Sequence, residues 1–277
     1  MKVGRIVPPV EPGVTRVLVP TMGALHDGHR SLMRAARVQA GESGEVVVSV
    51  FVNPTQFAQG EDFDAYPRTL DADEHVCRAE GVDFLYAPTV SDIYGGDDRH
   101  DRITIDPGTL GRELEGEARP THFSGVLTVV SILFHRVQPD IAVFGEKDYQ
   151  QLQLIRRMND DLGFGIRVVG IETVRDVDGV ALSSRNAYLS SQARRRAASI
   201  PAAMNAAQSA AVDGTGAAKD AAEEVLRAGG VEIDYVEVRS VDLGEGPEQG
   251  PARLLIACMV EGTRLIDNCL ITVGEGR

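Results

Sequence analysis

Two histidines on a glycine-rich turn are the first residues of this sequence that could do chemistry. His26 and His29 lie three positions apart with Gly28 between them, after the short apolar run Val17–Val19. The turn opens a helix expected over about 29–40, and the unpaired N–H groups of a helix N-terminus favour phosphate. Imidazoles donate hydrogen bonds to phosphate oxygens. The pattern favours a phosphate site, with a tight turn that binds nothing and a zinc site as alternatives.

A glutamine follows the most apolar run of the chain. The run Val46–Val52 is almost continuously β-branched, as expected of a parallel strand buried on both faces, and it ends at Asn53–Phe57. Ligands of open α/β sheets bind at the carboxyl ends of the strands. Gln56 offers a donor and an acceptor suited to a hydroxyl or a carboxylate. The alternative is an ordinary loop after a strand.

A lysine stands in the same position after another apolar run. Lys147 follows Ile141–Phe144 and a glycine, and it is a point charge suited to phosphate. Asp148 could cap the next helix, orient Lys147 or help to hold a magnesium-bound nucleotide. Gln151 lies one helical turn beyond Lys147, so both side chains could face one pocket. A charged cap on a solvated helix is the alternative.

Hydroxyl groups and a guanidinium are adjacent further along the chain. Ser183, Ser184 and Arg185 follow Asp176–Gly179, which has the composition of a hairpin turn. Such groups in a row can clamp an anion. A polar loop that leads into a helix is the alternative. His122, before a long apolar helix, is interpreted as a capping or core histidine or as a ligand.

The elements that must position these residues alternate between strand and helix. Apolar strands and amphipathic helices succeed one another from about 14 to 171, which indicates an α/β fold with a Rossmann-like parallel sheet and helices on both faces. A short strand is also expected at Ile103–Ile105. The remainder predicts two Ala-rich helices broken at Asp213–Gly214, and then three antiparallel strands. We expect two domains, at 1–173 and 174–277, the second a smaller α+β domain.

The bulk composition excludes several classes of protein. A net charge of −13 opposes non-specific binding to nucleic acid or anionic membranes, so positive groups must gather locally if the substrates are anions. No apolar run approaches the roughly 20 residues that span a bilayer, and no signal peptide is recognised. The three cysteines suit reduced thiols in a cytoplasmic protein.

The motifs together resemble the family of pantothenate synthetases. Six blocks occur in the family's order: VPTMGALHDGH, FVNPTQF, DAYPRT, RPTHFSGV, QPDIAVFGEKDYQQLQLI and DGVALSSRN. The family belongs to the nucleotidyltransferases that share a HIGH-type motif with class I aminoacyl-tRNA synthetases. His26–His29 matches that motif, and Leu182–Arg185 resembles the second, mobile signature.

The resemblance implies a function and a set of site residues. It implies that ATP activates pantoate as a pantoyl-adenylate, that β-alanine then forms the amide pantothenate, and that AMP and pyrophosphate leave. The resemblance marks His29 as catalytic, and we expect His26 and Lys147 to act with it by stabilising charge on the phosphates. The resemblance also implies that Gln56 and Gln151 hold pantoate, with Gln56 beside β-alanine. ATP is bound by Met22, Gly23, Ala24, Leu25, His26, Asp27, Gly28, His29, Gly145, Glu146, Lys147, Asp148, Val174, Leu182, Ser183, Ser184 and Arg185.

The same resemblance implies a homodimer, a C-terminal lid, and Mg²⁺ that arrives with the nucleotide without an assigned protein ligand. The family usually carries a helix before the first strand, but Pro8–Pro9 and Pro12–Gly13 disfavour one here. Three rival functions stay open at this point. They are another adenylate-forming or dinucleotide-forming enzyme of the superfamily, a nucleotide-binding regulatory module and a zinc protein.

Overall fold

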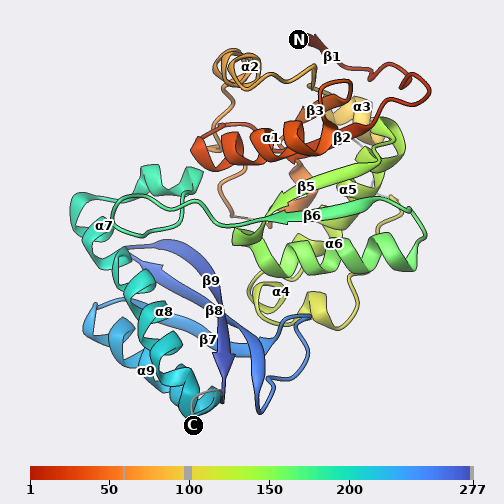
Figure 1. Ribbon diagram of the computed structural model, residues 1–277. Coiled ribbons are helices and arrows are strands. Elements are labelled where there is room, and N and C mark those ends of the chain that lie inside the picture. Colours follow the sequence, from red (N-terminus) through yellow and green to blue (C-terminus); the bar gives the residue numbers. More distant parts are fainter. Residues whose placement is uncertain (59, 97–101, 275–277) are drawn as a thin grey trace. The chain divides into compact units, whose positions relative to one another are not determined.

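Six parallel strands form the central sheet of the N-terminal part of the chain (Figure 1). The computed structural model describes residues 1–58, 60–96 and 102–274. The chain divides into two compact units, each treated by itself below. The N-terminal unit comprises Met1–Glu146 and Gln150–Glu172, and the C-terminal unit comprises Lys147–Tyr149 and Thr173–Arg277.

The parallel sheet has the strand order β1-β4-β3-β2-β5-β6. Its strands are β1 (Lys2–Gly4), β2 (Arg16–Thr21), β3 (Glu45–Val50), β4 (Phe84–Tyr86), β5 (Ile141–Gly145) and β6 (Arg167–Ile171). The apolar runs of the sequence therefore form the central strands, as predicted. The chain adds strands outward from β2 in one direction, then returns to β5 on the other side of β2 and adds β6.

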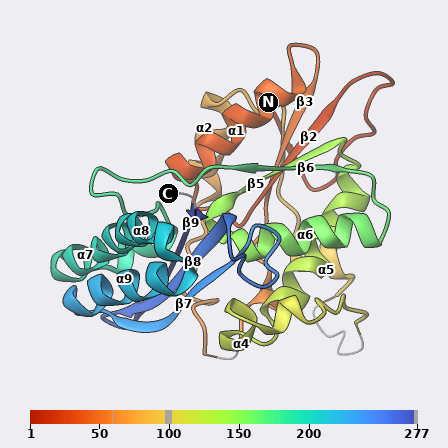
Figure 2. The ribbon, with the colours of Figure 1, turned by 60° about the horizontal axis from the view of Figure 1, so that its bottom comes forward.

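Helices cover both faces of this sheet (Figure 2). The crossover connections place α1 (Asp27–Ala40) and α2 (Leu70–Ala79) on one face, and α5 (His122–Val137) and α6 (Tyr149–Asp161) on the other. The short helices α3 (Val90–Tyr94) and α4 (Glu115–Ala118) lie in the connection between β4 and α5. The predicted α/β class with helices on both faces is confirmed.

Helix α1 shows why these elements form. Leu32, Met33, Ala36 and Ala40 recur at helical spacing and are buried, packed in one cluster with β-branched residues of β2 and β3. Full burial of an apolar side chain of the size of Met33 contributes about 1.5–3 kcal/mol. The helix ends at Gly41, whose φ of 70° is a conformation that side chains disfavour.

The segment before β2 contains a strand but no helix among its described residues. β1 pairs in parallel with β4 at the edge of the sheet, a strand that the sequence did not predict. The proline-containing stretch that follows is tied back by Arg16, whose guanidinium donates to the carbonyl oxygen of Pro8 at 2.9 Å. The expected absence of a helix agrees with the geometry, because proline lacks the N–H that a helix needs.

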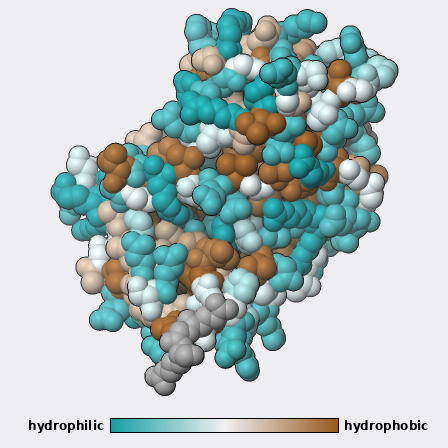
Figure 3. Space-filling model, in the orientation of Figure 1, coloured by the Kyte–Doolittle hydropathy of each residue, from teal (hydrophilic) through white to brown (hydrophobic). Residues whose placement is uncertain are grey.

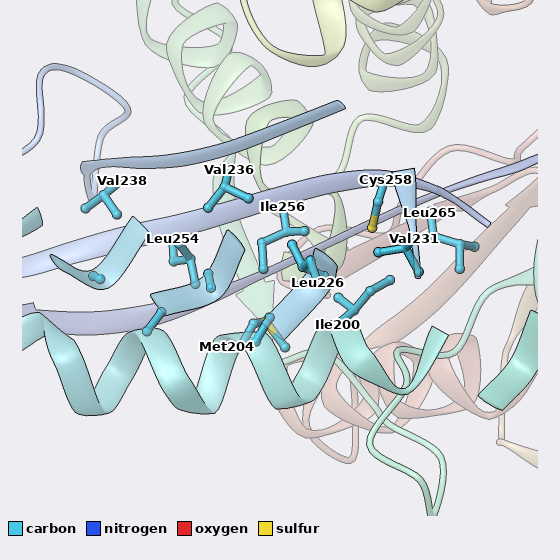
Figure 4. Packing of buried hydrophobic residues seen from close by; sticks show 14 of the residues in the cluster. Ile200, Met204, Leu226, Val231, Val236, Val238, Leu254, Ile256, Cys258 and Leu265 are labelled. Carbon is cyan, nitrogen blue, oxygen red and sulfur yellow. The ribbon is translucent and has the colours of Figure 1, made fainter. Parts of the chain in front are cut away.

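The C-terminal unit packs three helices on an antiparallel sheet. Strands β7 (Glu232–Ser240), β8 (Gly250–Val260) and β9 (Thr263–Val273) form a meander. Figure 4 shows Met204 of α8 (Ser199–Ala210) and Leu226 of α9 (Thr215–Ala228) directed toward Ile256 of β8. Buried alanines on both helices allow the close approach that this core requires. The predicted smaller α+β fold is confirmed.

Two details of the sequence-based expectations are wrong. The Ala-rich region has an additional break at Ala198, which separates α7 (Ser191–Ala197) from α8, as well as a 3₁₀ turn at Ala211–Asp213. Ile103–Ile105 forms no strand. The backbone N–H of Ile105 donates instead to Thr128 Oγ1 of α5, so the alternating pattern did not correspond to a pairing partner.

Charged and polar residues predominate on the face of the molecule drawn in Figure 3, in keeping with 25% charged residues in the sequence. Apolar residues appear there in separate small groups. Within the described part of the chain, every helix is too short or too polar to cross a membrane.

Candidate active site

The two histidines of the glycine-rich turn form the N-terminal cap of α1. His26 Nδ1 accepts the backbone N–H of Gly28 at 3.2 Å, and His29 Nδ1 accepts the backbone N–H of His26 at 3.2 Å. This is a capping box in which imidazoles replace the usual Ser and Glu. Each Nδ1 needs its lone pair to accept, so the proton of each neutral ring is on Nε2. The ring centroids are 4.1 Å apart.

The backbone before the cap adopts conformations that most residues avoid. Gly23 has φ of 81° and Ala24 has φ of 50°. A Cβ atom at Gly23 would approach Asp73 Oδ2 to 2.9 Å and Val50 Cγ1 to 3.0 Å. Asp73 of α2, 1% exposed, accepts the N–H groups of Ala24 at 3.2 Å and Leu25 at 2.8 Å. A buried carboxylate therefore holds the turn in its unusual shape.

The turn after β3 contacts the turn after β2 through Gln56. This residue ends the 3₁₀ turn η1 (Pro54–Gln56), and its side chain is held at both ends. Gln56 Nε2 donates to Met22 Sδ at 2.9 Å, and Gln56 Oε1 accepts from Asn53 Nδ2 at 3.2 Å. Gln56 is 8% exposed. The two sequence motifs, distant in the chain, are thus in direct contact within the N-terminal unit.

These turns lie at the point of the sheet where ligands of doubly wound folds bind. β2 and β5 are neighbours, and the chain leaves them toward opposite faces of the sheet. Such a switch in direction opens a crevice at the carboxyl ends of the two strands. Thr21 ends β2 and Gly145 ends β5, so Met22–His29 and Glu146 both begin at the carboxyl ends of these two neighbouring strands. Gln151 lies in α6, which follows.

Lys147 and Asp148 follow β5 and Glu146 in the chain and belong to the C-terminal unit. Lys147 Nζ and Asp148 Oδ1 form an ion pair at 3.4 Å, which corresponds to one of the three roles that the sequence leaves open for Asp148. The carbonyl oxygen of Lys147 accepts from Asn268 Nδ2 at 2.8 Å. The next residue, Tyr149, donates its hydroxyl to the carbonyl oxygen of Val241 at 2.8 Å. These contacts fix the backbone that carries the lysine.

The hairpin predicted at Asp176–Gly179 is present. Leu182 N–H donates to the carbonyl oxygen of Val174 at 2.9 Å, and Arg175 and Ala181 form an isolated β-bridge. Arg175 binds both carboxylate oxygens of Asp267, at 2.6 and 2.9 Å, and Asp267 is 4% exposed. This bidentate pair anchors the hairpin within the C-terminal unit.

The serine and arginine signature follows the hairpin. Ser183 caps the 3₁₀ turn η4 (Ser184–Tyr188), because its hydroxyl accepts the backbone N–H of Arg185 at 3.3 Å. Asn186 Nδ2 donates to the carbonyl oxygen of Ala181 at 2.9 Å. These two hydrogen bonds hold the backbone of the turn in one conformation next to the β-bridge.

Sequence reasoning missed two residues that support the site. The sequence places Asn53 only in a loop, yet its side-chain NH₂ group donates to Gln56 and its Oδ1 accepts the hydroxyl of Tyr94 at 2.6 Å. Asp73 could have been recognised from its position. It is an acidic residue on the buried face of α2, four residues before Cys77, and a buried carboxylate requires hydrogen-bond donors.

Metal binding by protein side chains alone finds no support in the described ranges. Among residues 1–58, 60–96 and 102–274, no group of three or more His, Cys, Asp or Glu side chains is arranged to hold an ion. In the turn at His26 and His29, the Nδ1 atoms of both rings are used for the helix cap.

Comparison with known proteins decides the family. Residues 10–270 match the family Pantoate-beta-alanine ligase. The chain belongs to this family. Curated relatives named pantothenate synthetase include that of Nocardioides sp., 54% identical over 93% of this chain and 79% of the relative. That of Mycolicibacterium vanbaalenii is also 54% identical, over 93% of this chain and 82% of the relative.

Solved structures of the family share the fold. Pantothenate synthetase from Thermus thermophilus has a TM-score of 0.87 and 41% identity, covering 97% of this chain and 99% of that one. Pantoate-beta-alanine ligase from Francisella tularensis, complexed with beta-gamma ATP and beta-alanine, has a TM-score of 0.78 and 32% identity. That match covers 94% of this chain and 91% of the other.

Proposed function

We propose that this protein condenses (R)-pantoate with β-alanine at the expense of ATP. The product is pantothenate, and AMP and pyrophosphate are released. The observation that carries this proposal is the contact between Gln56 and Met22, which joins an amide suited to a small polar acid to a turn suited to phosphate. Family membership and the ligands of the Francisella tularensis structure support the same reaction.

The reaction has two steps on this site. A carboxylate oxygen of pantoate attacks the α-phosphorus of ATP, the bond to the bridging oxygen breaks, and pyrophosphate leaves. The neutral amine of β-alanine then attacks the acyl carbon of pantoyl-adenylate, AMP leaves with the electron pair of the acyl–oxygen bond, and the nitrogen loses a proton to give the amide. Phosphorus chemistry of this kind depends on positioning and on stabilisation of negative charge.

The histidine pair and the lysine perform that stabilisation. The capping box holds His26 and His29 as neutral rings with the proton on Nε2, the atom that donates to a phosphate oxygen. Lys147 adds a positive charge next to β5. A proton on the departing pyrophosphate is unnecessary, because pyrophosphate bound to Mg²⁺ is already a good leaving group. We therefore assign electrostatic roles rather than acid catalysis to both histidines.

The remaining assignments follow the family motifs. ATP contacts Met22–His29, Gly145–Asp148, Val174 and Leu182–Arg185. Pantoate contacts Gln56 and Gln151, and β-alanine lies beside Gln56. Mg²⁺ bound to the nucleotide would neutralise phosphate charge, and no protein ligand is assigned to it.

Residues 174–277 act as a lid over the nucleotide-binding domain at 1–173, and exclude water from the adenylate. A cytoplasmic homodimer is the proposed biological form.

One coupled assay tests the function. Purified protein is supplied with ATP and Mg²⁺, and pyrophosphate release is followed with and without pantoate, and then with β-alanine. Pantoate-dependent pyrophosphate release, with pantothenate formed only when β-alanine is present, is the expected result. A dinucleotide-forming relative would release pyrophosphate without pantoate. A regulatory module would bind ATP without turnover, and either outcome overturns the proposal.

A further inference from the structure

The carbonyl oxygen of Gln56 is held by two side chains, one from the C-terminal cap of α4 and one from the first residue of α5. Arg119 Nη2 donates to it at 3.2 Å, and His122 Nδ1 lies 2.9 Å from it. A carbonyl oxygen only accepts, so the proton of His122 in this contact is on Nδ1. Neither residue belongs to the set that contacts substrate in the proposed reaction. Both act on the backbone of a residue that does.

Arg119 is itself fixed by a carboxylate. Its Nε and Nη2 atoms bind the two oxygens of Glu61, each at 2.7 Å, in the planar fork geometry that arginine and carboxylate share. The side chains of Arg119 and Glu61 are 16% and 23% exposed. Burial alone would raise the pKa of Glu61, but the hydrogen bonds and charge of Arg119 lower it. The carboxylate is therefore ionised, and the guanidinium has a defined orientation toward Gln56.

Helix α5 also approaches the Gln56 turn without an intervening side chain. A Cβ atom at Gly125 would come within 2.3 Å of the carbonyl oxygen of Thr55 and 2.7 Å of the backbone nitrogen of Gln56. The carbonyl oxygen of Gly125 accepts from Asn53 Nδ2 at 3.2 Å. The backbone of the first turn of α5 thus packs directly against the 3₁₀ turn that carries Gln56.

The side-chain contacts of Gln56 are too weak to position it alone. Its donor meets a thioether sulfur, which is a weak acceptor, and its acceptor receives a neutral hydrogen bond at 3.2 Å. A hydrogen bond from a guanidinium is roughly twice as strong as a neutral one. The backbone anchor therefore fixes the position from which the side chain extends, and the side-chain contacts then orient the amide.

We propose that Arg119, oriented by Glu61 and assisted by His122, is a positioning residue that fixes the Gln56 amide for pantoate. The inference rests on the proposed function, because it uses pantoate as the ligand of Gln56. An amide displaced by about 1 Å can cost a reaction up to about 100-fold. Loss of the anchor should therefore raise KM for pantoate while leaving KM for ATP nearly unchanged.

The test compares Arg119→Met with Arg112→Met. Arg112 also pairs with a carboxylate, that of Asp106, but its contacts do not include the Gln56 turn. We expect Arg119→Met to raise KM for pantoate about tenfold, with KM for ATP changed less than about twofold. Glu61→Gln should give a smaller change in the same direction, and Arg112→Met none. Equal effects on both KM values, or no effect, would overturn the inference.

A double-mutant cycle separates positioning from general damage. If Arg119 acts through the Gln56 amide, Arg119→Met should raise KM for pantoate by less than about twofold in a Gln56→Ala background. A full tenfold effect there would overturn the inference. Urea unfolding of each variant shows whether the fold persists, and Arg119→Lys supplies a milder variant that keeps the charge but loses the fork. A wild-type protein without pantoate-dependent turnover would refute the proposed function instead.

Discussion

The carboxylate of Asp73 accepts the backbone N–H of Leu25 at 2.8 Å, and its second oxygen accepts that of Ala24 at 3.2 Å. A third donor, Thr69 Oγ1, lies 3.2 Å away. These hydrogen bonds place the buried carboxylate of Asp73 against the backbone of the turn that is proposed to bind ATP. The carboxylate satisfies backbone N–H groups of a segment that contains positive φ angles. The turn therefore keeps one conformation before ATP binds.

Substitution of Asp73 tests that relationship. Asp73→Asn keeps the volume but replaces one of the two accepting oxygens by an NH₂ group that faces a backbone N–H. We therefore expect destabilisation by about 1–3 kcal/mol and a fall of about tenfold or more in kcat/KM for ATP. Urea unfolding and steady-state kinetics measure the two effects. Asp71→Asn, an exposed residue on the same helix, is the control and should change neither. Wild-type kinetics for ATP in Asp73→Asn would refute a role in shaping the turn.

The assignment of electrostatic roles to the histidines predicts a difference between two variants of His29. Glutamine has a carbonyl oxygen that can accept from His26 N–H and an NH₂ group that donates, but it does not titrate near neutrality. We expect His29→Gln to keep at least about tenfold more activity than His29→Ala, with a flatter pH profile. Equal inactivity of both variants at every pH from 6 to 9, with intact folding, would instead favour acid catalysis.

The buried thiols predict a pattern of chemical reactivity. Burial raises the pKa of Cys77 and of Cys258 to about 12 and that of Cys269 to about 11. Relative to the ordinary value of 9.0, the thiolate fraction of Cys77 at pH 8 is about a thousandfold lower. We expect no thiol to react with Ellman's reagent in the native protein at pH 8, and all three after denaturation. Rapid labelling of any thiol in the folded state would contradict this.

The same shifts give a direction for stability at high pH. A pKa raised in the folded state means that the native protein binds the proton more tightly than the unfolded chain does. The stabilisation is therefore complete below pH 9 and is lost as the pH rises toward 12. Urea unfolding at pH 8 and pH 10 should show the decrease, and Cys77→Ala should make it smaller.

The hairpin of the C-terminal unit predicts a change in proteolysis. Val177 at its tip is fully exposed, while Arg175 ties the hairpin to Asp267 and Arg194 binds the hairpin's own carboxylates. Because the polar turn that follows is proposed to close over ATP, ATP with pantoate should slow thermolysin cleavage before Val177 severalfold. Arg194→Met should speed cleavage of the free protein. Unchanged cleavage with ligands would argue against closure.

Much of the fold was predictable because its elements are strongly patterned. The run Val46–Val50 is β-branched and buried, and Leu32, Met33 and Ala36 share a helical face, so the strand and the helix were found within a few residues. Ile103–Ile105 shows the limit of such reasoning. Its alternation resembles that of a strand, but a strand forms only where a partner is available, and Ile105 bonds to a helix side chain.

The sequence by itself determined the chemical groups of the candidate site, because His26, His29, Gln56 and Lys147 stand in turns whose order is set by the chain. Only the tertiary structure decided what holds them. Asp73 binds the backbone of Leu25, 48 positions away in the chain, and Arg119 binds that of Gln56, 63 positions away. Asn53 binds the side chain of Gln56, which is only three positions away. Such partners depend on which strand lies beside which and on where a helix begins in space. Local propensity carries no information about either, so these supporting contacts appear only once the sheet and its helices are packed.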